Sequence, residues 1–192
     1  MWRLGATPVA GVDEVGRGAL AGPVVVAVVI LPYGPHPYRD SKQVSASQRE
    51  VWSDCIRREA VAWGIGLALP GEVDTLNVLG ATHLAAIRAL ASLAIEPRGL
   101  VTDRLYLNLA VPVLAPARAD RISLQVAAAS ILAKCYRDRL LKDLAQTYPA
   151  YGLDRNKGYG TRDHLKALHD HGPSDIHRRS FRPVRQDNLF SP

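Results

Sequence analysis

The chain has 192 residues, of which 47% are hydrophobic, and it carries a formal net charge of +6 with a sequence pI of about 9.6. This length and apolar content are typical of one large domain with a full core, and they exclude a disordered or fibrous chain. The longest apolar run, Val24 to Leu31, is too short to cross a bilayer, and the first residues lack a signal-peptide pattern, so no membrane association is expected. Only two cysteines occur, Cys55 and Cys135, which predicts free thiols, no structural zinc and a cytoplasmic protein.

The basic excess is concentrated in the last third of the chain. Residues 131–192 contain 12 Lys and Arg against 7 Asp and Glu, whereas residues 1–130 contain 12 against 11. This asymmetry favours a polyanion bound across a basic region at about 146–185, which is followed by a short tail at 186–192. On charge alone, the alternative is a basic protein with no nucleic-acid partner.

The most informative stretch runs from Val9 to Leu31. Its apolar start leads into Asp13 and Glu14, then into a glycine-flanked arginine at 16–18, and then into a second apolar run. This order predicts a strand, a polar turn and a second strand at 23–31. Successive side chains of a regular strand point to opposite faces, so the two carboxylates share a site only where the strand bends or ends, which the glycines permit. Two close carboxylates repel each other, and a divalent cation with oxygen ligands relieves that repulsion.

Two other interpretations of this stretch remain open. A pair of neighbouring carboxylates is most often a solvated acidic turn, although here apolar stretches flank the pair on both sides. Gly16, Gly18 and Gly22 after a strand also resemble a dinucleotide-binding loop. That loop needs a following helix and bare backbone amides for the pyrophosphate, whereas here β-branched residues follow and two carboxylates precede.

The middle of the chain alternates helices with strands. Ser45 and Gln48 form a capping box, which marks the start of a helix after the polar loop Asp40–Lys42. The expected elements are a helix at 46–60 with Val51, Trp52, Cys55 and Ile56 on its buried face, a strand at 62–69, and an Ala- and Leu-rich helix at 73–93 that can break near Gly80.

Two further acidic residues follow short apolar segments. A buried strand is expected at 100–102, with Asp103 at its end, and alternating and apolar residues through Val113 and Leu114 predict a fifth, short strand before Pro116. Asp120 comes just before a helix that begins near Ser123, where capping of that helix is the alternative explanation for a carboxylate. Strands that alternate with helices, with carboxylates at strand ends, predict an α/β sheet with its site along one edge.

A long helix with a small-residue start is predicted at 126–146. Ser130 and Lys134 lie four residues apart on one face of it, as do Lys134 and Asp138. Asp138 therefore has a simple explanation as the ion-pair partner of Lys134.

The segment at 151–161 is polar and rich in glycine. Lys157 and Tyr159 lie on it, and Thr161 caps a short helix that ends at Gly172. An aromatic ring beside a lysine in a glycine loop suits stacking on a sugar or base, with phosphate contacts alongside. The alternative is a tyrosine that packs onto the core.

Four segments of the chain form a set: GVDEVGRGALAGPVV at 11–25, DSKQVS at 40–45, AAASILAKCYRD at 127–138, and KGYGT with the later IHRRSF at 157–181. Together, in this order and spacing, they resemble the bacterial type 2 ribonuclease H family, ribonuclease HII. The resemblance covers nearly the whole chain and implies a single catalytic domain over 1–192. The implied fold is α/β and RNase H-like, with a mixed five-stranded sheet flanked by helices and a helical C-terminal region.

The resemblance also implies an activity and the residues that carry it. The activity is hydrolysis of the RNA strand of RNA/DNA hybrids and cleavage 5′ to single ribonucleotides in duplex DNA, which leaves 3′-hydroxyl and 5′-phosphate ends. Two Mg²⁺ or Mn²⁺ ions are implied, held by Asp13, Glu14, Asp103 and Asp120. The implied substrate contacts are the Gly16, Arg17 and Gly18 backbone at the 2′-hydroxyl, Tyr159 on the following deoxyribose, and Lys42, Ser130 and Lys134 at phosphates.

Two residues depart from the family's pattern. Arg104 follows Asp103, and Ala119 precedes Asp120, where the family usually has glycine. If either glycine supplies a positive φ, the substitution alters the metal geometry, and Arg104 also adds a cation near the scissile phosphate. A catalytically impaired hybrid-binding protein of the same fold is therefore an alternative, as is a junction resolvase or transposase on that fold.

The tail contains QDNLF, which resembles the short peptide by which bacterial replication proteins bind the sliding clamp. Gln186, Leu189 and Phe190 are the residues that would make this contact. The alternative is an ordinary chain terminus with one apolar pair. Since no unclaimed apolar helix face stands out in the sequence, a monomer is expected.

Overall fold

The computed structural model describes residues 7–39 and 41–185, except the side chain of Lys42. At its centre lies a mixed sheet of five strands in the order β3-β2-β1-β4-β5. β1 pairs antiparallel with β2 and parallel with β4, which confirms the predicted mixed sheet. The strands are β1 (Val9–Val15), β2 (Val24–Ile30), β3 (Ala62–Ala68), β4 (Gly99–Thr102) and β5 (Val113–Leu114).

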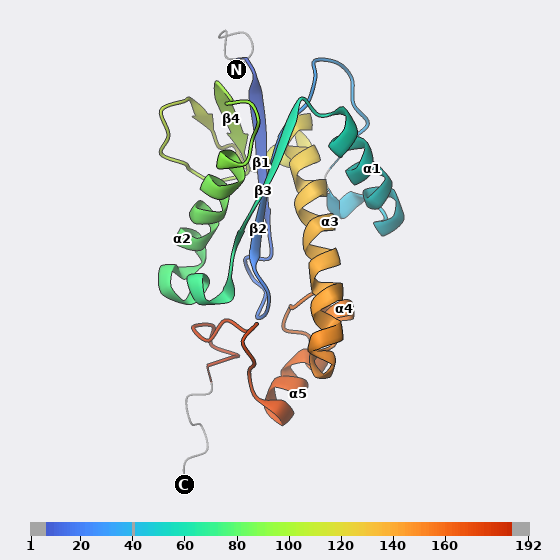
Figure 1. Cartoon of the computed structure of the whole chain (residues 1–192), viewed down its shortest axis with the longest axis vertical. Helices are drawn as coiled ribbons and strands as arrows, with labels where there is room; N and C mark the ends of the chain where they lie inside the picture. Colours follow the sequence, from blue (N-terminus) through green and yellow to red (C-terminus); the bar gives the residue numbers. More distant parts are fainter. Residues whose placement is uncertain (1–6, 40, 186–192) are drawn as a thin grey trace.

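Helices cover both faces of the sheet. Figure 1 shows α2 on one face and α1 with α3 on the other, while α4 and α5 lie beyond the end of the sheet. The helices are α1 (Ala46–Glu59), α2 (Pro70–Ala91), α3 (Leu124–Thr147), α4 (Leu153–Asn156) and α5 (Arg162–His171). Three short 3-10 turns, η2 (Ser41–Gln43), η3 (Ala119–Arg121) and η4 (Pro149–Tyr151), connect them.

The strand β2 is apolar throughout because each of its faces is covered by a helix. Val24, Val26 and Val28 belong to the core cluster that includes α2, and the alternate residues Val25 and Val29 belong to the cluster formed with α3. The residues after the glycine turn thus form a strand antiparallel to β1 rather than a helix. This arrangement excludes the dinucleotide-binding interpretation.

Two helices differ from the sequence prediction. The break in α2 lies at Asn77, which has a φ of 58° and whose Oδ1 accepts hydrogen bonds from the Leu79 and Gly80 amides. Asn77 caps the second half of α2, so the break that was predicted near Gly80 lies three residues before it. In α1 the buried residues are Ser53 and Ile56, whereas Val51 is 57% exposed, because α1 packs on α3 along a different stripe.

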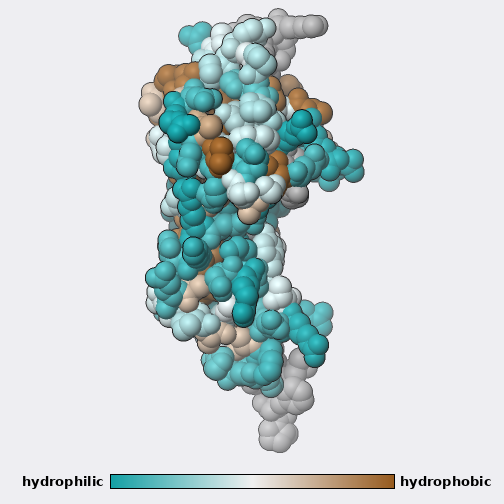
Figure 2. All heavy atoms as spheres, turned by 90° about the vertical axis from the view of Figure 1, so that its right-hand side faces the viewer, coloured by the Kyte–Doolittle hydropathy of each residue, from teal (hydrophilic) through white to brown (hydrophobic). Residues whose placement is uncertain are grey.

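A third core cluster joins the end of α3 to the C-terminal segments. It includes Leu20 and Ala21 from the connection between β1 and β2, together with Leu141, Tyr151 and Ile176. Figure 2 shows that the face carrying α1 and α3 is mostly hydrophilic, with smaller hydrophobic patches near its upper end. None of the helices in the described ranges has the length and apolar character that a bilayer crossing needs.

Candidate active site

A pocket of about 290 Å³ lies beside the polar end of β1. It gathers side chains from β1, the loop after β4, the η3 turn, α3 and the loop before α5. All four predicted carboxylates and three of the predicted substrate contacts lie in it. Its lining residues are Asp13, Glu14, Val15, Ser41, Arg49, Asp103, Asp120, Ser130, Lys134 and Tyr159.

The surroundings of Asp13 in this pocket strongly disfavour its charged form. Burial, followed by the charge of Glu14 and to a smaller extent that of Asp120, raises the pKa of Asp13 from 3.8 to about 8. A hydrogen bond from Ser130 acts in the opposite direction. The pocket therefore concentrates negative charge that the protein itself does not balance.

Glu14 is only half satisfied by the protein. Its Oε1 accepts a hydrogen bond from Arg17 Nη1 at 3.2 Å, and its Oε2 is buried without a hydrogen-bond partner. Burial raises the pKa of Glu14, and the bond from Arg17 lowers it in part. Asp103 is held differently, because its Oδ1 accepts from the Arg118 amide at 2.8 Å.

The carboxylates share a pocket without forming a ready cage for a cation. Within residues 7–39 and 41–185, no three acidic, His or Cys side chains are grouped closely enough to hold a metal ion. The donor set nevertheless fits a hard divalent cation, because four carboxylates supply only oxygen ligands. The orphaned Glu14 Oε2 and the raised pKa of Asp13 are the features that such a cation would relieve.

The α3 side of the pocket is tied to the loop before α1. Ser130 Oγ lies 2.8 Å from Ser41 Oγ, and both residues are buried. Lys134 lines the pocket, while its Nζ donates to Asp138 at 2.7 Å, which confirms the predicted ion pair.

Arg49 is a pocket residue that the sequence analysis missed. Its Nη1 donates to the Ser41 carbonyl at 2.8 Å and to the Val44 carbonyl at 2.5 Å. The signal available in the sequence was a basic residue near the start of α1, where the helix dipole disfavours positive charge. Arg49 instead fixes the turn that places Ser41 beside α3.

The glycine turn lies next to the pocket, connected to it through the ion pair of Arg17 with Glu14. Gly16 has a φ of +90°, and Gly18 is exposed with open space on its Cβ side. Tyr159 reaches the pocket with 37% of its surface exposed, so it is not fully packed into the core. The Lys42 side chain and residues Gln186, Leu189 and Phe190 lie outside the described part of the chain.

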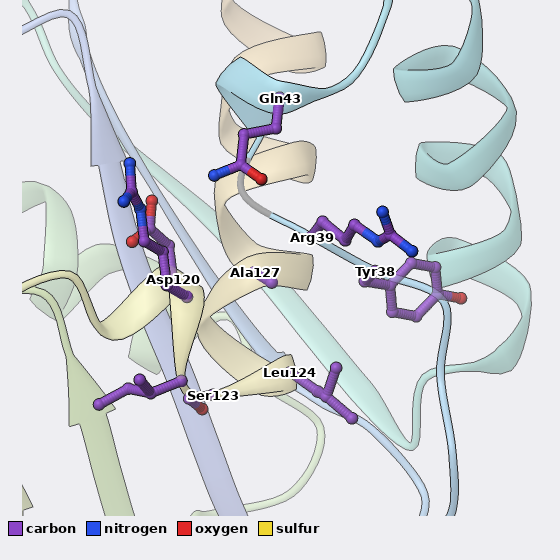
Figure 3. Close-up of a pocket in the computed structure, with 9 residues that line it drawn as sticks. Tyr38, Arg39, Gln43, Asp120, Ser123, Leu124 and Ala127 are labelled. Atoms are coloured by element: carbon purple, nitrogen blue, oxygen red, sulfur yellow. The ribbon is translucent and has the colours of Figure 1, made fainter.

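A second pocket of about 410 Å³ adjoins the first across Asp120, which lines both. Figure 3 shows Gln43 extending from η2 in front of α3, above Ala127, with Tyr38 and Arg39 on one side and Asp120 on the other. Ser123, and not Asp120, is the N-cap of α3. Helix capping therefore does not account for the position of Asp120.

The two departures from the family pattern have different backbone conformations. Arg104 has a φ of 52°, so this position does require the left-handed region that glycine tolerates best. Ala119 lies in the η3 turn outside that region, and the positive φ belongs to Arg118 at 57°.

Replacing Arg104 with glycine is therefore expected to stabilise the protein by about 0.5–1 kcal/mol, because a non-glycine residue is strained there. The matched variant Ala119→Gly should lower stability by at least a similar amount, since it adds backbone freedom to the unfolded chain and removes a buried methyl group. Urea unfolding of both variants measures this. Stabilisation by Ala119→Gly, with none from Arg104→Gly, would contradict the assignment.

Two buried histidines support the backbone of Tyr159. His164 Nδ1 lies 2.9 Å from the Tyr159 carbonyl, its Nε2 lies 3.1 Å from His177 Nε2, and the Ser174 amide donates to His177 Nδ1 at 3.1 Å. All these bonds form together only if both rings are neutral, with His177 Nε2–H donating to His164 and His164 Nδ1–H donating to Tyr159. Burial lowers the pKa of both rings, and it lowers the pKa of His177 to about 4.

Acidification is expected to loosen this region first. The folded pKa of His177 lies below its ordinary value of 6.5, so its stabilisation is complete above pH 6.5 and is lost as the pH falls towards about 4. Its other neighbours, the Tyr151 ring and the charge of Arg179, do not favour protonation of the buried ring. Amide exchange of α5, corrected for intrinsic rates, should accelerate over this range.

The variant His177→Gln should lose most of this pH dependence, while His169→Gln, at an exposed position, should keep it. Equal pH dependence in the wild type and in His177→Gln would contradict this explanation.

The comparisons with known proteins agree with this geometry. The model of the family described as Ribonuclease HII matches residues 10–184. A ribonuclease HII of Thermus thermophilus is 52% identical over 191 residues, which cover 100% of this chain and 94% of that protein.

Two solved archaeal structures are similar as well. The ribonuclease H2 of Pyrococcus horikoshii OT3 matches with a TM-score of 0.76 and 29% identity over 92% of this chain and 95% of that one. The RNase HII of Archaeoglobus fulgidus, solved in a complex with PCNA, matches with a TM-score of 0.75 and 25% identity over 88% of this chain and 93% of that one.

Proposed function

The chain belongs to the ribonuclease HII family of metal-dependent ribonucleases, and on this premise we propose that it cuts duplex DNA on the 5′ side of single embedded ribonucleotides, as well as the RNA strand of RNA/DNA hybrids. The products carry 3′-hydroxyl and 5′-phosphate ends. The observation that carries this proposal is the gathering of Asp13, Glu14, Asp103 and Asp120 in one pocket beside the glycine turn.

The metal requirement of the proposal follows from the donor set. We propose that Asp13, Glu14, Asp103 and Asp120 hold Mg²⁺ or Mn²⁺, with two ions in the active complex. Divalent cations supply Lewis-acid stabilisation of the phosphate charge and activation of water. The protein orients the donors: Ser130 bonds to Asp13, Arg17 to Glu14, and the Arg118 amide to Asp103.

Substrate selection rests on two exposed features beside the pocket. The backbone at Gly18 is open to solvent, which allows a ribose to approach closely enough for its 2′-hydroxyl to be read. The partly exposed Tyr159 ring offers a stacking surface for the next sugar. Ser130 and Lys134 line the same pocket and are proposed to contact phosphates, as is Lys42.

The test is the cut position on a defined duplex that contains one ribonucleotide, with Mg²⁺ or Mn²⁺ present. Cleavage immediately 5′ to the ribonucleotide by the wild type, and none by Asp13→Asn, is the expected result. Binding of the hybrid without any cut by the wild type would favour a catalytically impaired binding protein. Equal cutting of an all-DNA duplex would point to a resolvase or transposase activity instead.

We also propose that the QDNLF tail binds a bacterial sliding clamp and that the protein is a cytoplasmic monomer. Support for the first part comes from the A. fulgidus relative, which was solved with PCNA, while the tail itself lies outside the described residues. Deletion of residues 186–192 should abolish clamp binding and leave cleavage intact. Unchanged clamp binding after the deletion would contradict this role, and a dimer by light scattering would contradict the monomer.

A further inference from the structure

The short linker Leu20–Pro23 joins the glycine turn at 16–18 to β2, and two distant segments bond to it. The Gly158 carbonyl accepts from the first two amides of the linker, at 2.8 and 3.2 Å. On its other side, the Arg178 amide donates to the first carbonyl of the linker at 2.9 Å. The glycine turn and the turn that carries Tyr159 therefore meet at one short piece of backbone.

The guanidinium of Arg137, from α3, fills one side of this junction. It donates to the carbonyls of Pro23 at 3.0 Å, Ala21 at 3.0 Å and Lys157 at 2.7 Å. Its Cζ also lies 5.6 Å from the centroid of the Tyr159 ring. One side chain thus touches both the linker and the turn that carries Tyr159.

The guanidinium of Arg178 fills the other side and reaches the glycine turn directly. Its Nη1 donates to the Arg17 carbonyl at 2.8 Å, and its Nε and Nη2 donate to the Gly22 carbonyl at 3.2 and 2.9 Å. Arg137 also packs against the start of the turn, because a Cβ on Gly16 would overlap its side chain.

Packing alone does not account for two arginines at this place. Both are fully buried, and no carboxylate of the described residues lies within ion-pair distance of either. Burial lowers the pKa of both, and burial together with the charge of Arg137 lowers the pKa of Arg178 to about 10. Apolar residues of similar volume would fill such a space without this electrostatic cost, so the hydrogen bonds to backbone carbonyls are what distinguish arginine here.

We propose that Arg137 and Arg178 are positioning residues that determine selectivity for a single ribonucleotide. They fix the position of the glycine turn relative to the turn carrying Tyr159, which we call the register of the two turns. In this register, the ribose read by the glycine turn is the neighbour of the sugar stacked on Tyr159. This inference rests on the proposed function. It predicts that the register, and not only the presence of the two turns, sets the selectivity.

The variant Arg178→Lys distinguishes an effect of the register of the two turns from an effect of positive charge. Lysine keeps the positive charge but lacks the planar fork, so it cannot donate to the Arg17 and Gly22 carbonyls in the same way. A duplex with one ribonucleotide offers one productive register, whereas a uniform RNA/DNA hybrid offers a ribose at every step. We expect kcat/KM to fall about 100-fold on the first substrate, mainly in kcat, and about tenfold or less on the second.

The decisive readout is the ratio of kcat/KM on the single-ribonucleotide duplex to kcat/KM on the uniform hybrid, because partial unfolding lowers both values equally. Arg139→Lys is the matched control on α3: this residue is exposed, pairs with Glu50 and should leave the ratio unchanged. Arg137→Lys should also lower the ratio, and it should do so less in a Tyr159→Ala background if it acts through that ring. If thermal melting shows that Arg178→Lys is not folded, Arg137→Lys serves as the test instead.

The outcomes separate this inference from its premise. Equal losses on both substrates would overturn the positioning role while leaving the nuclease assignment intact. A wild-type protein that leaves the single-ribonucleotide duplex uncut would overturn the proposed function, and the positioning role with it.

Discussion

Replacing Asp13 with Asn is expected to abolish cleavage and at the same time to stabilise the metal-free fold. Loss of a carboxylate that is proposed to bind metal should lower kcat by about 10³-fold or more, because it removes several kcal/mol of charge stabilisation. Stability moves in the opposite direction, since Asp13 is crowded by Glu14 and Asp120 in a buried setting. We expect a gain of about 2–4 kcal/mol near pH 7, less than the full pKa shift implies because one side of the pocket is open to solvent.

The pH dependence of stability gives this prediction a definite sign. The folded pKa of Asp13, about 8, lies above the ordinary value of 3.8, so the folded state binds an extra proton between these values. Stability of the metal-free wild type therefore falls as the pH rises through this window, and the Asp13→Asn variant should lack that fall. Below pH 6.5 the buried His177 acts in the opposite direction, so the Asp13 effect is best measured in the window from pH 6.5 to 8, as the difference between the wild type and Asp13→Asn.

Thermal melting with and without Mg²⁺ or Mn²⁺ measures both effects. The cation should raise the melting temperature of the wild type more than that of Asp13→Asn, because the wild type offers one more buried carboxylate to the cation. Asp143→Asn, at an exposed position on α3, is the matched control and should change neither stability nor cleavage. A metal-free Asp13→Asn protein that is less stable than the wild type at pH 7 to 8 would refute the electrostatic account.

Three of the four carboxylates in the pocket were predictable because they interrupt or end an apolar segment. Asp13 and Glu14 break a run that continues in β2, and Asp103 directly follows β4, so local pattern and chemistry agree. The resemblance contributed the grouping of Asp103 and Asp120 with the first pair. Their position in one pocket depends on strand order, which the spacing of residues does not encode.

What the sequence did not reveal depends on long-range packing. Arg137, Arg178 and His164 all lie within or beside motifs of the chain, yet no local pattern separates a buried arginine that binds carbonyls from an exposed one. The break in α2 was predicted near Gly80 and lies three residues before it, at Asn77, because the Asn77 side chain caps the second half of the helix through local hydrogen bonds. The roles of Arg137 and Arg178 become visible only when carbonyls more than a hundred residues away in sequence are brought to them.

The two glycines of the turn at 16–18 are expected to respond differently to the same added methyl group: stability and kcat should fall at Gly16, whereas only KM should change at Gly18. At Gly16 a Cβ would overlap the buried Arg137 side chain, and the φ of +90° is unfavourable for alanine. Gly16→Ala should therefore lower the free energy of unfolding by about 2–4 kcal/mol, through backbone strain and overpacking. The displaced turn should also reduce kcat on the single-ribonucleotide duplex by about 100-fold.

Gly18→Ala is the matched control, because nothing in the described structure lies within 4 Å of a Cβ at that position. Its stability should stay within about 0.5 kcal/mol of the wild type. Its methyl group points to the open side where the ribose is proposed to approach, so KM should rise while the fold is unaffected. Urea unfolding and steady-state kinetics on the same duplex separate the two variants. A Gly18→Ala protein as unstable as Gly16→Ala would show that the turn is packed differently. An unchanged KM for Gly18→Ala would show that the ribose does not approach the backbone at Gly18.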